Sequence, residues 1–167
     1  APRELGVAAI GFGGGQERDI RSGTQAVATI AAFAAALEAA QQGRTAFTTR
    51  AQSARENLVR TIERIPDLFV NQGKHGVPHI LNLSLVGRDT DYLVALLNES
   101  GFAVSTKSAC ESDSATGSRA VFALTHNEAR AASTLRVSWG PSTSERDLER
   151  IARALVSRVE FLDASRA

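Results

Sequence analysis

The chain has 167 residues, of which 43% are hydrophobic and 22% charged, with a formal net charge of +1. This is the length and composition of one soluble globular domain with a hydrophobic core of ordinary size. The balanced charge excludes an electrostatic case for binding nucleic acid or an anionic membrane.

The hydrophobic segments and the single cysteine indicate where in the cell the protein is expected to be. The most apolar stretch, residues 26–40, contains Glu38 and is too short and too rich in alanine to span a bilayer. No secretory pattern opens the chain and its one cysteine cannot form an internal disulfide, so we expect a cytoplasmic location. The chain begins at Ala1 and contains no methionine, and we expect it to be a processed or excised piece of a longer protein.

The first half of the chain is predicted to be helical after a loop-like segment over residues 1–20. Hydrophobic spacing predicts one helix over 24–42, ended by Gly43, and a second over 45–65, ended by Pro66. The apolar residues on one face of the first helix are Val27, Ile30, Phe33, Ala34 and Leu37.

Short strands and helices are predicted to follow. Residues 67–72 and 79–87 are typical of strands, and the second has leucines that alternate with Asn82 and Ser84. A short helix capped by Asp89 or Thr90 is expected to run to Asn98 and end at Gly101. Residues 102–105 are predicted to be a strand that leads into a cysteine loop.

The C-terminal part is predicted to contain a helical turn near 118–124, a strand over 134–139 and a last helix. Ser142 and Glu145 are predicted to form the capping box of that helix. Its buried residues are predicted to be Leu148, Ile151, Leu155, Val159 and Leu162. This irregular alternation indicates an α+β fold with a small sheet packed against helices.

Cys110 lies in the polar segment AVSTKSACESDSATG, residues 103–117. A cysteine kept for packing normally has apolar neighbours, whereas an exposed thiol indicates a chemical role. Lys107 would favour the thiolate, but Glu111 and Asp113 would oppose it. The residues alone leave a functional thiol and an incidental surface cysteine equally open.

Two other features admit both a functional and an ordinary interpretation. The segment GGGQERDIRSGT, residues 13–24, offers backbone N–H groups and the Thr24 hydroxyl to a phosphate, or is simply a glycine loop before a helix. Arg136 lies in the middle of a strand, where it is either a carboxylate clamp or part of a solvated face. The three histidines lack metal-ligand spacing, and we expect no metal site.

Four segments in the same order closely resemble the successive motifs of the cysteine desulfurases, which are pyridoxal-phosphate enzymes of the class V aminotransferase family. They are GGGQERDIRSGT (13–24), VPHILNLSL (77–85), SACESDS (108–114) and STLRVSWG (133–140). The resemblance implies a segment of a fold type I enzyme. Residues 1–23 would be a glycine-rich loop from the large domain, 24–65 connecting helices and 66–167 the small C-terminal α+β domain.

The resemblance also implies roles for individual residues. Cys110 would attack the sulfur of L-cysteine and become a persulfide, on a mobile loop that carries sulfur to an iron–sulfur scaffold or another acceptor protein. Arg136 would hold the substrate carboxylate, with Asn82 near the pocket. Thr24 would contribute to the phosphate site of the opposite subunit in a homodimer.

The chain departs from the family pattern in its lysines. The family holds pyridoxal phosphate through a lysine upstream of the glycine motif, and neither Lys74 nor Lys107 matches that position. Phe12 and Asp19 stand where relatives often have histidine and glycine. We therefore expect this segment to be inactive alone and to act within a longer enzyme.

Two other readings stay open at this point. One is a different class V aminotransferase or lyase whose cysteine is incidental, which the SAC motif in a long loop disfavours. The other is a non-catalytic module that accepts sulfur or binds a scaffold without the cofactor.

Overall fold

The computed structural model describes residues 6, 8–106 and 117–165 of the chain. Contacts divide the chain into two units, Ala1–Arg44 and Thr45–Ala167. The elements are η1 (Gln16–Asp19), α1 (Val27–Ile62), β1 (Leu68–Asn71), β2 (Ile80–Leu85), α2 (Thr90–Glu99), α3 (Arg119–Thr125), α4 (Glu128–Ala132), β3 (Thr134–Ser138) and α5 (Glu145–Ala164).

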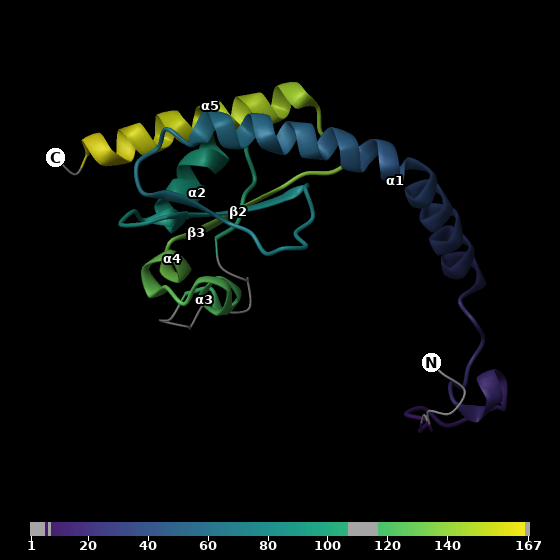
Figure 1. Cartoon of the computed structure of the whole chain (residues 1–167). Coiled ribbons are helices and arrows are strands. Elements are labelled where there is room, and N and C mark those ends of the chain that lie inside the picture. The colour runs from purple at the N-terminus through teal and green to yellow at the C-terminus, as the bar shows by residue number, and fades with distance from the viewer. Residues whose placement is uncertain (1–5, 7, 107–116, 166–167) are drawn as a thin grey trace. The chain divides into compact units, whose positions relative to one another are not determined.

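The second unit has the predicted α+β architecture. Its antiparallel sheet has three strands in the order β1–β2–β3. Within this unit, α2, α5 and the adjoining part of α1 lie on one side of the sheet, and α3 and α4 lie on the other (Figure 1). No helix in the described part of the chain is long and apolar enough to cross a membrane.

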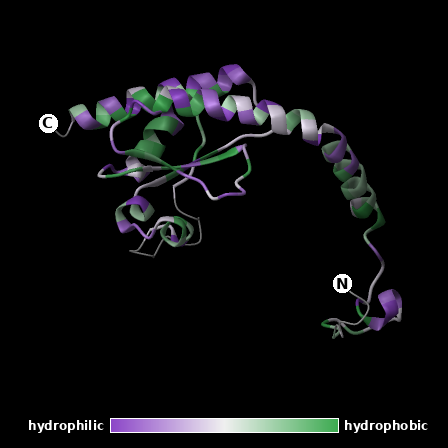
Figure 2. Cartoon of the chain, viewed as in Figure 1, coloured by the Kyte–Doolittle hydropathy of each residue, from purple (hydrophilic) through white to green (hydrophobic). Residues whose placement is uncertain are grey.

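The core lies between the sheet and the helices α1, α2 and α5. Leu81, Leu83 and Leu85 of β2 are fully buried there, as the alternation in the sequence predicts. The five residues predicted to be buried on α5 are buried in the structure. Figure 2 shows the strands and α2 as largely hydrophobic, whereas α5 carries both hydrophilic and hydrophobic residues along its length.

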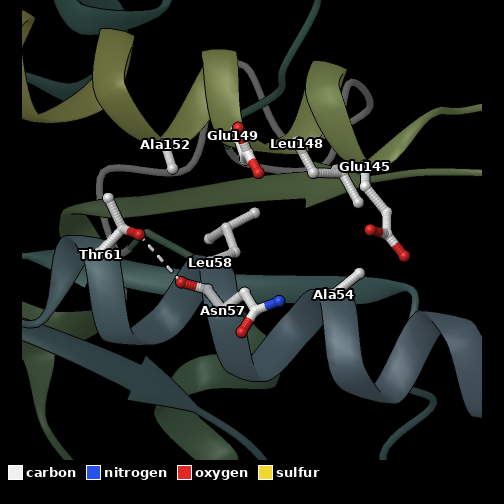
Figure 3. Close-up of a pocket in the computed structure, with 8 residues that line it drawn as sticks. All are labelled: Ala54, Asn57, Leu58, Thr61, Glu145, Leu148, Glu149 and Ala152. Carbon is white, nitrogen blue, oxygen red and sulfur yellow. Dashed lines mark hydrogen bonds between the residues drawn. The ribbon is translucent and has the colours of Figure 1, made fainter.

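The helices α1 and α5 pack directly against each other within this unit. Leu58 of α1 and Leu148 and Ala152 of α5 are buried at the contact, which Figure 3 shows in close-up. The crevice left between them has a volume of about 30 Å³, which is room for one or two water molecules. The contact between the two helices is part of the packed core, and its crevice is too small to bind a substrate.

The prediction of two helices separated at Gly43 is wrong. α1 is one helix from Val27 to Ile62 and runs through Gly43. A glycine inside a helix costs only about 1 kcal/mol relative to alanine, and it ends a helix only where the chain turns away. The flanking alanines, Gln41, Gln42 and Arg44 favour helix strongly enough to continue it.

The predicted strand over 102–105 is also wrong. Gly101, with φ of 85°, ends α2, and the N–H of Phe102 donates back to the carbonyl of Leu97. This is the usual hydrogen bond of a helix that closes on a left-handed glycine. The chain therefore reaches the edge of β3 only at Ser105, where an isolated bridge pairs it with Arg136.

The capping box of α5 lies two residues beyond its predicted position. Ser144 accepts from the N–H of Asp147, and the Asp147 carboxylate accepts from the N–H of Ser144. The hydrogen bonds from Ser144 hold the pKa of Asp147 below its usual value. Ser142 instead lies inside the turn before the helix, in which the Thr143 N–H donates to the Gly140 carbonyl.

Candidate functional site

A row of polar residues crosses the face of the sheet opposite the core. Asn71 of β1 pairs with Asn82 of β2, and Asn82 pairs with Arg136 of β3. Directly paired residues in an antiparallel sheet project their side chains to the same face. The strand register therefore brings together three residues that are 11 and 54 positions apart along the sequence.

A pocket with a volume of about 530 Å³ opens over this row. Its walls come from the sheet, from α3 with its N-cap, and from the chain that leaves the bridge at Ser105. The lining residues are Asn71, Asn82, Thr106, Ser118, Arg119, Ala120, Val121, Leu124 and Arg136.

Both predicted substrate-binding residues line this pocket. Arg136 is exposed, and among the described residues its guanidinium has no hydrogen-bond or ion-pair partner. Its backbone is fixed by two hydrogen bonds with Ser105, of 2.7 and 3.2 Å. Asn82 is half-buried and sits beside it. The pocket thus has a free cation on a rigid strand, which suits a carboxylate, while the two assigned roles stay predictions.

Cys110 and its predicted mobile loop fall in the segment 107–116, outside the described residues. The described residues on either side of this segment both lie at the pocket. Thr106 lines the pocket and donates its hydroxyl to Asp91 at 2.9 Å, and Ser118 lines it from the N-cap of α3. Thr106 and Ser118, on the two sides of residues 107–116 in the sequence, therefore both line the pocket.

Gly117 fixes the C-terminal end of this segment. Its φ is 73°, and a Cβ built there would lie 2.4 Å from the carbonyl oxygen of Ala131 in α4. The neighbouring Ser118 N–H donates to the same carbonyl at 2.9 Å. Only glycine allows this close approach of two backbone segments, so Gly117 positions the wall of the pocket that α3 forms.

Replacing Gly117 with alanine should lower the free energy of unfolding by more than about 2 kcal/mol, because it adds both a clash and an unfavourable φ. Gly101→Ala is the matched control, since Gly101 has φ of 85° but open space around its Cβ. We expect the control to cost only about 1–2 kcal/mol. Denaturant unfolding of the three proteins measures the difference, and equal losses would show that the close approach does not matter.

Thr24 belongs to the first unit, which is described by itself. It is exposed, and α1 begins three residues later, at Val27, so the prediction of a helix that starts at Thr24 is wrong. The Arg21 guanidinium donates to the carbonyls of Gly23 and Thr24 at 2.8 and 3.1 Å. These two hydrogen bonds stabilise a turn at the position where the first turn of the helix was expected. Thr24 remains exposed in this turn.

Among the residues that sequence reasoning missed are Asn71, which lines the pocket, and Arg130, which contacts Asn71 from behind the lining. Asn71 is buried at the end of β1, and Arg130 of α4 donates to its side-chain oxygen through Nε at 3.1 Å and also through Nη2. The alternation of side chains along β1 could have indicated Asn71. Leu68 and Val70 point toward the core, so Asn71 lies on the other face of the sheet. Nothing in the local sequence indicated the contact with Arg130.

None of the described residues that line the pocket is a lysine. Enzymes that use this cofactor hold it through a lysine. Lys74, the one lysine in the described part of the chain, is exposed in the turn between β1 and β2 and does not line the pocket. The described lining residues include donors that fit an amino-acid carboxylate.

Comparison with known proteins agrees with this architecture. The chain is 33% identical to cysteine desulfurase IscS of Pseudomonas fluorescens over 91% of its own length and 37% of the relative's length. Among solved structures, the NifS-like protein of Rickettsia africae superposes with a TM-score of 0.76 at 20% identity, over 93% of this chain and 41% of that one. DndA of Streptomyces lividans superposes with a TM-score of 0.58 at 29% identity, over 81% of this chain and 37% of that one.

These matches confirm the predicted fold class, an α+β segment of a fold type I enzyme. The chain spans about 37% of the length of the curated relatives it matches. A model of the family described as aminotransferase class-V matches residues 12–151, which include every described residue of the pocket. The chain belongs to the class-V aminotransferase family, and the curated relatives that it matches include cysteine desulfurases.

Proposed function

We propose that the full-length protein is a pyridoxal-phosphate-dependent cysteine desulfurase. It would convert L-cysteine to L-alanine and transfer the sulfur to Cys110 as a persulfide for iron–sulfur cluster or thiocofactor synthesis. One observation supports the proposal: Thr106 and Ser118, which flank the SAC motif in the sequence, line the same pocket as Arg136, whose guanidinium has no partner among the described residues.

The residues of this chain would act in two ways. Arg136 would bind the substrate carboxylate with two parallel hydrogen bonds and so orient the rest of the amino acid. The Cys110 thiolate would then attack the substrate sulfur, so that a sulfur–sulfur bond forms as the carbon–sulfur bond breaks. The electron pair of the broken bond stays on carbon, which takes up a proton to give alanine.

Other parts of the proposal concern the assembled enzyme. Thr24 would bind the cofactor phosphate of the opposite subunit, which makes a homodimer part of the active site. The partners would be L-cysteine and an iron–sulfur scaffold or another sulfur acceptor protein, in the cytoplasm. Residues 1–23, 24–65 and 66–167 would be the loop, connecting and small-domain parts of that enzyme.

The products formed by the full-length protein test this function. With added pyridoxal phosphate and L-cysteine, we expect equal amounts of alanine and of persulfide sulfur, the latter released as sulfide by a thiol reductant. A class-V aminotransferase would instead need a keto-acid acceptor, and a lyase would give pyruvate. Either of those outcomes would contradict the proposed reaction.

The isolated chain should be inactive and should not bind the cofactor covalently. Lys74 is exposed and does not line the pocket, so added pyridoxal phosphate should modify lysines only weakly and without selectivity after borohydride reduction. Peptide mass spectrometry locates the modified residues. One lysine trapped stoichiometrically, together with desulfurase activity, would show that this chain contains the complete site.

A further inference from the structure

The side-chain amide of Asn71 is buried and could be oriented in two ways, with its oxygen and nitrogen exchanged. Its hydrogen-bond partners determine which direction it takes. Arg130 has only N–H donors, and its Nε and Nη2 both point at the Asn71 side-chain oxygen. The oxygen must therefore face Arg130, and the amide nitrogen must face β2. From there Nδ2 donates to the oxygen of Asn82 and to the hydroxyl of Ser84, each at 2.7 Å.

The remaining contacts hold this arrangement in place. The Ser84 hydroxyl donates to the backbone carbonyl of Arg130 at 2.8 Å, so its proton is used and it can only accept from Asn71. The Arg130 guanidinium also donates to the carbonyl of Val70 at 3.3 Å and lies over the ring of Phe69, 5.0 Å from its centroid. Arg130 itself does not line the pocket.

The direction of Asn71 determines what Asn82 offers to the pocket. The Asn82 oxygen is occupied by Asn71, while among the described residues its amide nitrogen has no partner. Asn82 lines the pocket next to Arg136, whose guanidinium also has only donors. Asn82 and Arg136 therefore both present N–H groups to the pocket, and a carboxylate can accept hydrogen bonds from both residues.

We propose that Arg130 is a positioning residue that acts through Asn71 to turn the Asn82 amide N–H toward the pocket, so that Asn82 and Arg136 together bind the substrate carboxylate. This role rests on the proposed function, because it names the part of L-cysteine that the pocket binds. If Arg130 could also accept hydrogen bonds, both amides could turn over, and Asn82 would present an oxygen that repels the carboxylate.

The direction of the amides is tested first, on the chain itself and without any activity. In the chain labelled with ¹⁵N and ¹³C, NMR should detect scalar couplings across the hydrogen bonds from Arg130 Nε to the side-chain carbonyl of Asn71, and from Asn71 Nδ2 to that of Asn82. Arg130→Met should abolish the first coupling and weaken the second. Absence of both couplings in the wild-type chain would overturn the proposal, whatever the enzyme does.

Substrate affinity is tested next, in the full-length protein. Arg130→Met should raise KM for L-cysteine about three- to tenfold with little change in kcat, and Arg130→Lys, which remains donor-only, should recover part of the loss. A residue needed only for folding would lower stability and leave KM unchanged. An unchanged KM in a folded Arg130→Met protein would therefore overturn the positioning role.

Asn82→Asp gives the sharpest test, because it keeps the shape of the side chain and replaces the donor by an anionic acceptor beside Arg136. We expect KM for L-cysteine to rise about ten- to a hundredfold. Asn98→Asp, the same change at an exposed position on α2, is the matched control and should leave KM unchanged. Equal effects of the two variants would overturn the proposal. Intact couplings in a protein that does not use cysteine would refute the proposed function but support the direction of the amides.

Discussion

Full-length protein with Cys110 replaced by serine should bind L-cysteine and form no persulfide. A serine hydroxyl cannot accept sulfur to form a persulfide, and removing a nucleophile of this kind lowers turnover by at least about a thousandfold. The change should leave the pocket intact, because Asn82 and Arg136 are held by the sheet. Mass spectrometry of the peptide that contains residue 110 measures the gain of one sulfur atom after reaction with L-cysteine.

A matched control separates loss of the thiol from damage to the segment around it. Ser112→Ala changes a neighbouring hydroxyl in the same segment and should retain persulfide formation. Binding of L-cysteine to the Cys110→Ser protein should stay within about threefold of the wild type, because the described residues that line the pocket are unchanged. Sulfur transfer that persists in the Cys110→Ser protein would remove Cys110 from the reaction.

Arg136→Ala should weaken L-cysteine binding by about ten- to a hundredfold, since a hydrogen bond to a charged group contributes roughly 1.5–3 kcal/mol. Arg136→Lys should recover only part of this affinity, because an ammonium cannot form the two parallel bonds. The free energy of unfolding should change by less than about 0.5 kcal/mol. The reason is that the Arg136 side chain is exposed and its bonds with Ser105 come from the backbone.

Steady-state kinetics and denaturant unfolding of the full-length protein measure the two quantities separately. Arg146→Ala, a change at an exposed arginine on α5 away from the pocket, is the control for a general effect of lost charge. Its KM should equal that of the wild type. Unchanged kinetics in the Arg136→Ala protein would show that the carboxylate binds elsewhere.

Local periodicity predicted the elements of the core. The leucines of β2 and the buried face of α5 recur at strand and helix spacing, and the hydrophobic effect buries such faces wherever they pack. Ser84 shows the limit of this reasoning. Its place in the alternation predicts a polar face, yet it is fully buried beneath α4, where its hydroxyl donates to the Arg130 carbonyl. Whether a helix packs over the polar face of a strand depends on tertiary structure, and the residues of the strand do not indicate it.

The errors at element ends have a common cause. The expected helix end at Gly43, the expected cap of α5 and the expected strand over 102–105 rest on residue preferences of about 1 kcal/mol, which neighbouring hydrogen bonds outweigh. At Gly43 the surrounding helix formers continue the helix, and at residue 102 the closing bond of α2 uses the N–H that a strand would need. Where a helix or strand ends therefore depends on the preferences and hydrogen bonds of several residues together and not on one residue.

The amino-acid sequence by itself determined the order of the four motifs, the α+β class and the places of Asn82, Cys110 and Arg136 in the chain. These follow from residue identity and short-range spacing, which need no knowledge of distant contacts. Only the tertiary structure decided that Asn71, Asn82 and Arg136 form one row over a pocket and that Arg130 determines the direction of the amides. The reason is physical: strand register and the packing of α4 join residues up to 65 positions apart, and no local preference specifies those contacts.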